Sequence, residues 1–245
     1  MSRAEQVKSR LTGRGRTAPT TLVVLVRHGT TATTGRELPG RAPGLDLADT
    51  GRTQAQAAAA RIAAMAGRNN GADAKDNDKN GKDAKTPPEP VLYASPLERA
   101  QQTAAPIADA LGCAIQTEDD LTDLDIGEWT GMELKVAVKR KEWTAIQRHP
   151  SGFRFPGGES FMDMQARMVA AIERMRAQHP GQLVVAVSHA DPIRSLVAHA
   201  LGSHLDMFQR IMISPGSLTA IAFGDEGPAV LTVNSTHDGQ ALSPS

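Results

Sequence analysis

Two short apolar runs, each followed by a histidine, dominate the hydrophobic pattern of the chain. The run LVVLV at 22–26 precedes Arg27 and His28, and the matching run LVVAV at 183–187 precedes a serine and His189. Continuous apolar runs of this length, rich in valine, are typical of β-strands that are buried on both faces. We therefore predict two buried strands that stop abruptly at polar residues.

Helical patterns alternate with strand patterns along the rest of the chain. Ser95 as N-cap, Pro96 at the first helical position and Gly112 at the end bound one predicted helix. Strands and helices that alternate in this way predict an α/β fold, a three-layer α/β/α arrangement with a mostly parallel central sheet. The predicted strands are 22–26, 91–94, 114–116, 183–187, 218–223 and 229–233, and the predicted helices are 50–65, 96–111, 133–148, 159–178 and 192–201.

Two segments lack the apolar residues from which a core is built. Residues 1–19 are basic and contain no apolar block, so we expect a disordered tail rather than a secretory signal. Residues 67–90 contain no Val, Ile, Leu, Met or aromatic residue, so we expect a disordered hydrophilic insert. The expected organisation is one domain over 20–236 that carries this insert, with a flexible C-terminal tail at 237–245.

Composition and charge exclude only a few classes of function. The 27 Lys and Arg balance 27 Asp and Glu, so net charge gives no reason to expect binding to nucleic acid or to a membrane. No run of 18 apolar residues exists, so no membrane span is expected. The single cysteine, Cys113, cannot form an intramolecular disulfide, and we expect a cytoplasmic protein. The remaining histidines show no metal-ligand spacing, so neither a metal nor a cofactor is expected.

The two strand-end histidines suggest where chemistry takes place. If the two strands are parallel neighbours, His28 and His189 share the carboxyl edge of the sheet, where ligands bind in open α/β folds. Arg27 precedes the first histidine, and Arg99 lies in the first turn of a helix whose N-terminus favours anions. These cations predict a site for a dianion, since a guanidinium fork suits phosphate oxygens. Taken singly, each residue could equally have a structural or surface role.

Five sequence blocks carry a family resemblance. LVRHGTT, YASPLERAQQTA, LTDLDIGEWTG, FPGGES and VSHADPIRSL occur in this order between residue 22 and about residue 234. Together they resemble the histidine phosphatase superfamily, which includes the phosphoglycerate mutase-like enzymes. A closer similarity is to actinobacterial-type proteins described as probable phosphomutases, in which GRAPGLDL and HLDMFQRI have counterparts.

The resemblance implies a phosphoglycerate mutase-like fold and a role for each matching residue. His28 is implied as the nucleophile that accepts the phosphoryl group on a ring nitrogen. Nearby arginines disfavour its imidazolium form and so keep it able to attack. The residues implied to hold the substrate are Arg27, Arg99, His189, Thr31, Thr34, where many relatives have asparagine, and Ala190, where glycine is common.

The implied general acid is Asp123, and here the sequence departs from the family, which usually has glutamate. Its carboxylate is shorter by one methylene, yet it can donate a proton to the leaving alkoxide and later activate water. Asp125 and Glu128 are fallback candidates that do not align with the family position.

Three functions remain open at this stage. The leading hypothesis is a metal-independent phosphomonoesterase that acts on a small phosphorylated metabolite through a phosphohistidine. A phosphomutase would use the same site, but only 65 residues separate Asp123 from His189, fewer than in true phosphoglycerate mutases. A phospho-ligand binding protein without catalysis is the third hypothesis, favoured only by the aspartate at 123. A homodimer is a family-level expectation.

Overall fold

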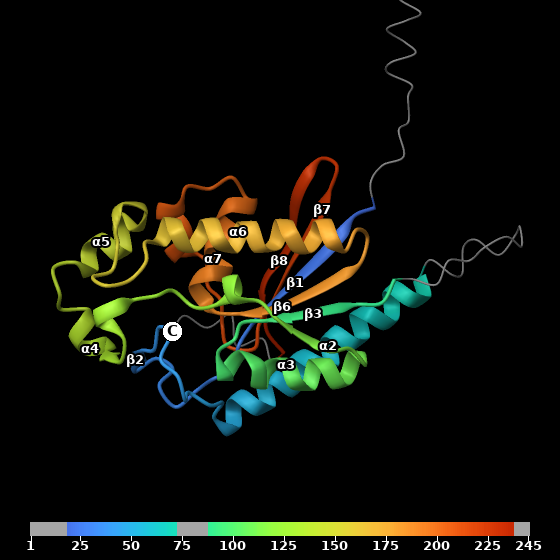
Figure 1. The fold of residues 1–245 in the computed structure, drawn as a ribbon, viewed down its shortest axis with the longest axis horizontal. Helices are drawn as coiled ribbons and strands as arrows, with labels where there is room; N and C mark the ends of the chain where they lie inside the picture. Colours follow the sequence, from blue (N-terminus) through green and yellow to red (C-terminus); the bar gives the residue numbers. More distant parts are fainter. Residues whose placement is uncertain (1–18, 73–87, 238–245) are drawn as a thin grey trace, which may run out of the picture.

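A six-stranded β-sheet forms the centre of the molecule, of which the computed structural model describes residues 19–72 and 88–237 (Figure 1). The strands lie in the order β4-β3-β6-β1-β7-β8. The first four are mutually parallel, whereas β7 runs antiparallel to β1 and β8 antiparallel to β7. The prediction of a mostly parallel sheet is confirmed. The strands are β1 (Thr21–Arg27), β3 (Val91–Ala94), β4 (Ile115–Thr117), β6 (Leu183–Ser188), β7 (Leu218–Gly224) and β8 (Gly227–Ser235).

Helices cover both faces of this sheet, as the three-layer prediction requires. They are α2 (Asp49–Ala72) and α3 (Glu98–Leu111) on one face, and α6 (Phe161–Gln178) and α7 (Ala190–Ala200) on the other (Figure 1). Successive side chains of a strand point to opposite faces, so β1 contributes to two cores. Val24 packs with Ile62 of α2, whereas Leu25 packs with Met168 of α6. The continuous apolar run of β1 therefore reflects burial on both faces.

Short elements gather at the end of the molecule toward which β1 and β6 run (Figure 1). They enclose a third buried cluster, in which Trp129, Phe155, Phe161 and Phe208 are packed together. This cluster covers the carboxyl edge of the sheet. The short elements are β2 (Glu37–Leu38), η1 (Asp119–Leu121), η2 (Gly127–Trp129), β5 (Met132–Glu133), α4 (Leu134–Ala137), α5 (Trp143–Arg148), η3 (Pro150–Gly152) and η4 (Leu205–Arg210).

The prediction of one continuous helix over 133–148 is wrong. The segment forms two short helices, α4 and α5, that are separated by residues 138–142. Residues 138–141 are exposed and so bury no apolar side chain, and a helix gains most of its stability from such packing. The break allows Ala137 and Ile146, one from each helix, to enter the third cluster.

The predicted N-terminus of α3 is also displaced. The helix begins at Glu98 with Leu97 as N-cap, so Ser95 and Pro96 precede it. The Ser95 hydroxyl contacts a ring nitrogen of His189 instead of capping the helix. Gly112 ends the helix in the left-handed conformation at φ 66°, as predicted.

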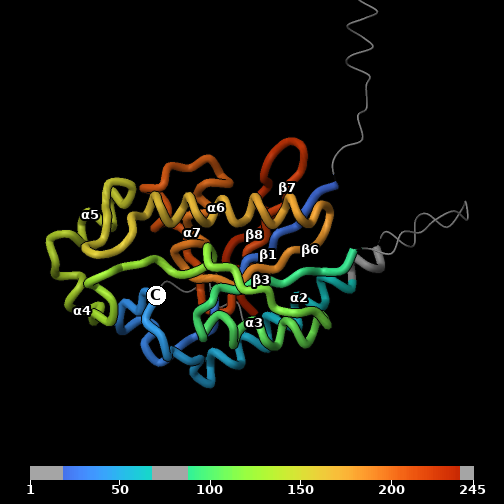
Figure 2. Tube along the Cα trace, viewed as in Figure 1, coloured from blue at the N-terminus to red at the C-terminus, as the bar shows by residue number. Residues whose placement is uncertain are grey.

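Helix α2 is longer than the predicted 50–65. It continues to Ala72, so residues 67–72 of the expected hydrophilic insert are helical. The remainder of that insert up to residue 87 lies outside the described residues, as do 1–18 and 238–245, for which tails were expected. In Figure 2 the trace of β1 runs between β6 and β7, which brings the first described strand into the middle of the sheet.

Close contact between two backbone segments fixes the loop that follows β1. A Cβ added to Gly29 would lie 2.4 Å from the carbonyl oxygen of Gly51, and one added to Gly51 would lie 2.1 Å from that of Thr30. Glycine at both positions therefore lets the start of α2 touch this loop directly. The loop is tied further by the Thr30 N–H, which donates to Gln54 Oε1 at 2.8 Å.

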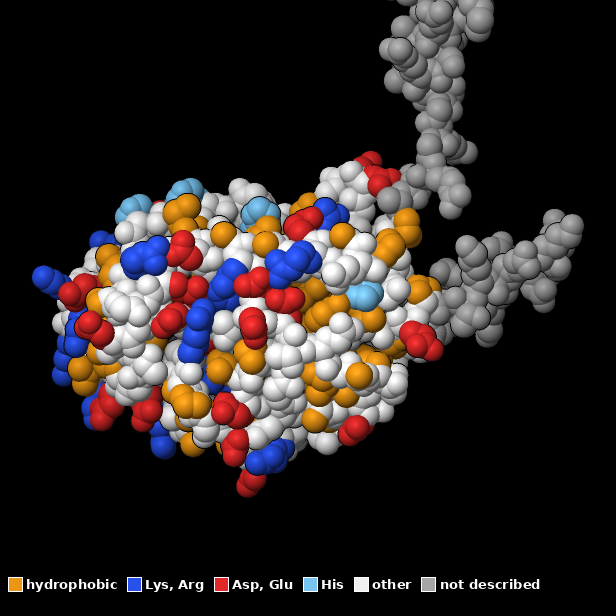
Figure 3. All heavy atoms as spheres, in the orientation of Figure 1, with side chains coloured by type: hydrophobic (Ala, Val, Ile, Leu, Met, Phe, Trp, Pro, Cys, Tyr) orange, Lys and Arg blue, Asp and Glu red, His pale blue; other side chains and the backbone are white. Residues whose placement is uncertain are grey.

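The surface carries both signs of charge. On the face in Figure 3, Lys and Arg side chains are interspersed with Asp and Glu, and no broad field of one sign is seen. Within the described ranges, no helix combines the length and apolar character needed to cross a membrane.

Candidate active site

His28 and His189 lie side by side at the carboxyl ends of two neighbouring strands. β1 and β6 are paired in register up to Arg27 and Ser188, and the backbone N–H of His28 donates to the Ser188 carbonyl at 3.0 Å. The two imidazole centroids are 5.0 Å apart. Both histidines are buried: 5% of the surface of His28 is exposed, and none of that of His189. The predicted meeting of the two strand ends is thus observed.

The protonation state of His28 follows from its contacts. Its Nδ1 lies 2.8 Å from the carbonyl oxygen of Gly29, which can only accept, so Nδ1 carries the hydrogen and Nε2 holds the lone pair. Burial lowers the pKa of His28 well below its usual value, and His189, Arg27 and Arg99 lower it further. His28 is therefore a neutral imidazole near pH 7, which is the form able to attack an electrophile.

Arg27, which is partly buried, and Arg99 bring two guanidinium groups to the histidines. Arg27 donates to the Ile213 carbonyl at 2.6 Å, and Arg99 to the Gly40 carbonyl at 2.7 Å. Burial and the neighbouring Arg194 lower the pKa of Arg27 to about 10, so it stays charged at neutral pH. Arg99 is fully buried.

Several buried nitrogens of this cluster lack a hydrogen-bond partner in the part of the chain described. They are Arg27 Nε, Arg99 Nε, Arg99 Nη1 and His189 Nδ1. A buried donor without an acceptor costs about 1–3 kcal/mol, and more when it is charged. Unpaired N–H groups around a histidine are what a tetrahedral oxyanion such as phosphate can satisfy.

Asp123 supplies the carboxylate of the cluster. Its Oδ2 lies 3.1 Å from Arg99 Nη2 and 3.6 Å from His189 Nδ1, and its side chain is 15% exposed. The fallback candidates lie elsewhere: Asp125 accepts from the Gly127 N–H and faces Arg41, and Glu128 is exposed. Among the three carboxylates predicted from the sequence, only Asp123 lies beside Arg99 and His189.

Glu159 holds the segment that carries Asp123. The Asp123 carbonyl accepts from Arg41 Nε at 2.9 Å and from Arg167 Nη2 at 3.0 Å. Both guanidinium groups also bind Glu159 Oε1, at 3.0 Å and 2.7 Å, and the same oxygen accepts from the Asp125 N–H at 2.9 Å. One carboxylate thus orders two arginines and one backbone amide around the acid.

Neither Arg41 nor Glu159 was among the site residues predicted from the sequence. Arg41 is half-buried against the Asp123 loop. Glu159 was expected only to mark the start of a helix. The FPGGES block held the signal, because Ser160 and Asp163 already form the capping box of α6 and so leave Glu159 free for another role.

Thr31, Thr34 and Ala190, which were predicted to hold the substrate, lie close to the histidines in sequence. The threonines form hydrogen bonds within their own turn, and Ala190 starts a helix. The Thr31 N–H donates to Thr34 Oγ1 at 2.9 Å, and the two hydroxyls are 3.1 Å apart, so they stabilise the turn after His28. Ala190 begins α7 directly after His189 with a negative φ, since Asn234 is the one non-glycine residue with positive φ in the described ranges. Glycine is therefore unnecessary at position 190.

Asp191 and Arg194 were missed by the sequence analysis. They lie in the first turns of α7, and Arg194 Nη1 donates to Asp191 Oδ1 at 3.0 Å. Burial raises the pKa of Asp191, and both residues act electrostatically on Arg27. Their i, i+3 spacing immediately after His189 was a readable signal, because residues so spaced on a helix are neighbours.

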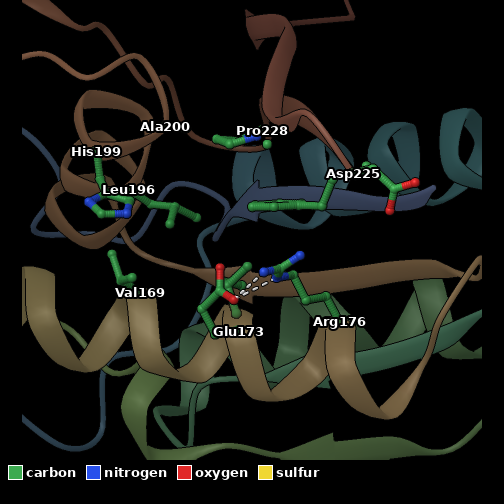
Figure 4. Close-up of a pocket in the computed structure, with 12 residues that line it drawn as sticks. Val169, Glu173, Arg176, Leu196, His199, Ala200, Asp225 and Pro228 are labelled. Carbon is green, nitrogen blue, oxygen red and sulfur yellow. Dashed lines mark hydrogen bonds and ion pairs between the residues drawn. The ribbon is translucent and has the colours of Figure 1, made fainter. Parts of the chain in front are cut away.

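A separate hollow of about 210 Å³ lies between α6, α7 and the turn that joins β7 to β8. Figure 4 shows Glu173 and Arg176, both on α6, pointing toward one another at the wall of this hollow. The Arg176 guanidinium also lies 5.4 Å from the centre of the Phe223 ring. The residues that line this hollow include none predicted from the sequence to carry chemistry.

No group of three or more His, Cys, Asp or Glu side chains within 19–72 and 88–237 is arranged to hold a metal ion. The positive charge of the site comes instead from Arg27 and Arg99.

Comparison with known proteins agrees with this geometry. The sequence pattern described as "Histidine phosphatase superfamily (branch 1)" matches residues 23–69 and 81–236. Phosphoserine phosphatase 1 of Hydrogenobacter thermophilus is 30% identical over 148 residues, which cover 60% of this chain and 70% of that protein. Bifunctional protein Rv2228c of Mycobacterium tuberculosis is 32% identical over 152 residues, which cover 60% of this chain but only 41% of that protein.

A solved structure shows the same fold. Mycobacterial glucosyl-3-phosphoglycerate phosphatase, in complex with VO3, is similar with a TM-score of 0.71 at 22% identity. The match covers 88% of this chain and 99% of that one. At this level of identity the similarity concerns the fold.

We predict that Glu159→Gln lowers the free energy of unfolding by about 1–3 kcal/mol. The substitution removes the largely buried carboxylate that Arg41 and Arg167 share as a counter-ion. Glu173→Gln is the matched control, since Glu173 pairs only with Arg176 at the surface, and it should change stability by less than about 0.5 kcal/mol. Urea unfolding at pH 7 measures both. Equal effects of the two substitutions would contradict the central role of Glu159.

Proposed function

Because this chain belongs to the histidine phosphatase superfamily, we propose that it hydrolyses phosphomonoesters of small metabolites through a phosphohistidine on His28, without a metal ion. The family and its named phosphatases support phosphatase activity in general. The intermediate, the metal independence and the roles of individual residues are the proposal.

The observation that carries this proposal is the set of unpaired N–H groups beside a neutral His28. Arg27 and Arg99 contribute buried N–H groups, and His189 places a buried ring nitrogen, Nδ1, among them. Such donors can bind the phosphoryl oxygens and stabilise the charge that spreads over them as the group is transferred. Because they are fixed before the substrate arrives, little reorganisation is needed during the reaction.

In the first step, Nε2 of His28 forms a bond to phosphorus while the bond from phosphorus to the ester oxygen breaks. The leaving alkoxide takes a proton from the acid form of Asp123, and an alcohol is released. In the second step, the Asp123 carboxylate takes a proton from water, whose oxygen attacks phosphorus as the P–N bond breaks. Inorganic phosphate leaves, and His28 and Asp123 return to their starting forms.

A phosphomutase would use the same first step and return the phosphoryl group to an organic acceptor. Hydrolysis is favoured because the segment between Asp123 and His189 has only 65 residues, which leaves less chain to shield the phosphohistidine from water. A protein that only binds phosphorylated ligands would need no nucleophile. The lone pair on His28 Nε2 argues against that function.

The first test is release of inorganic phosphate from a panel of phosphomonoesters in the presence of a chelator. Wild type should release phosphate, and His28→Ala should lower kcat/KM at least about a thousandfold, because it removes the proposed nucleophile. His199→Ala is the control, since His199 is an exposed imidazole on α7, and it should match wild type. Phosphoryl exchange between two metabolites without net phosphate release would identify a mutase instead.

The second test addresses Asp123. Asp123→Asn keeps the shape of the side chain but cannot donate or take a proton, so kcat for alkyl phosphates should fall about 10²–10⁴-fold. The loss should be much smaller for p-nitrophenyl phosphate, whose leaving group needs no protonation. Asp123→Glu, the usual family residue, should stay within about tenfold of wild type. Undiminished turnover of alkyl phosphates by Asp123→Asn would remove Asp123 from the acid role.

A further inference from the structure

A cavity of about 270 Å³ lies between the segment that follows Asp123, helix α5 and helix α7. This volume is several times the ~30 Å³ that one water molecule occupies in the liquid, so the cavity can hold a small organic group. Most of its wall is apolar or aromatic. The residues concerned are Leu124, Ile126, Trp143, Ile146, Phe155 and Phe161.

Polar side chains form another part of the wall. Asp191, Arg194 and Gln209 form a small cluster there, and Leu38 and the uncharged Gln147 complete the lining. Arg194 Nη1 donates to Asp191 Oδ1 at 3.0 Å and to Gln209 Oε1 at 3.4 Å, so the two charges neutralise each other. Arg194 Nε is buried and has no acceptor among the residues that the structure describes. The wall therefore offers an N–H to a ligand but no unpaired charge.

Two residues of the cavity wall are near neighbours in sequence of residues in the histidine cluster. Leu124 follows Asp123 directly, and Asp191 comes two residues after His189. Asp191 and Arg194 are also close enough to Arg27 to shift its pKa in opposite directions. An ester whose phosphate binds Arg27 and Arg99 can thus extend its alcohol part past Asp123 into the cavity.

We propose that this cavity binds the alcohol part of the substrate and selects uncharged alcohols with an aromatic or branched apolar body over small charged alcohols. The inference rests on the proposed phosphatase function and specifies its substrate class. Trp143, Phe155 and Ile146 contact the body of the alcohol, and Arg194 Nε donates to an oxygen of the alcohol where one is present.

Charged alcohols are disfavoured by desolvation. A carboxylate or ammonium group that enters an apolar cavity must lose its water, and this cost is offset only by an unpaired partner of opposite charge. The Asp191–Arg194 pair satisfies itself and supplies no such partner. An apolar ring instead gains free energy by leaving water.

The test compares benzyl phosphate with O-phosphoserine, which both release a primary alcohol and so present similar intrinsic chemistry. We expect kcat/KM for benzyl phosphate to exceed that for O-phosphoserine at least about tenfold. Equal values, or a preference for O-phosphoserine, would overturn the proposed selectivity while leaving the phosphatase function intact.

Trp143→Ala tests the cavity wall itself and should reduce this preference to less than about threefold. Trp143→Leu, which keeps an apolar side chain, serves the same purpose if the alanine variant does not fold. Met162→Ala is the matched control, because Met162 is 57% exposed on α6 beside the cavity residue Phe161, and it should preserve the preference. An undiminished preference in a folded Trp143 variant would contradict the assignment of the cavity.

If the wild-type protein hydrolyses neither ester, the phosphatase function is decided by the full panel of phosphomonoesters, and the cavity is tested separately by calorimetric binding of the two uncleaved esters. Tighter binding of benzyl phosphate than of O-phosphoserine would support the cavity as a site for apolar groups. Equal binding would overturn it.

Discussion

Packing of two guanidinium groups, one of them fully buried, against two buried imidazoles is the constraint on which the rest of the structure depends. Arg99 and His189 are fully buried, and His28 nearly so, yet the only carboxylate in hydrogen-bond reach of Arg99 in the described chain is that of Asp123. Positive charge that is not fully neutralised is costly in a protein interior. The histidines do not add to it, since burial and the arginines lower their pKa values. A bound dianion relieves the remaining cost, which links the stability of this centre to its ligand.

The pairing of β1 with β6 and the ion pairs of Glu159 hold the histidines, the arginines and Asp123 in place. Registry between β1 and β6 sets the two histidines side by side, and the Ser188 hydroxyl donates to the Leu121 carbonyl, which anchors the loop that leads to Asp123. Glu159 then orders Arg41 and Arg167 around the Asp123 carbonyl. The acid is therefore held by its backbone, and its side chain remains free to face Arg99 and His189. The position of this carboxylate therefore depends on the loop as well as on the length of the side chain.

The sequence allowed the sheet and the meeting of His28 with His189 to be predicted, because burial on both faces of a strand leaves a continuous apolar run. It did not reveal the break between α4 and α5, which depends on how residues 138–142 meet the rest of the fold. The contacts of Arg41 were also not predicted, since its partners at 123 and 159 are distant in sequence. Ser95 has the residue type of a helix cap but contacts His189 across the sheet edge. Contacts between distant segments override local preference at these positions.

The most direct test of the account is to trap the phosphorylated enzyme. Wild-type protein mixed briefly with a substrate that it hydrolyses, denatured in alkali and digested, should carry one phosphoryl group on the peptide that contains His28. That group should resist alkali and be lost in acid, as a phosphoramidate is, and Asp123→Asn should accumulate it if water activation becomes slow. Turnover without any phosphorylated His28 peptide, or an acid-stable phosphate on another residue, would contradict the central claim that His28 is the nucleophile.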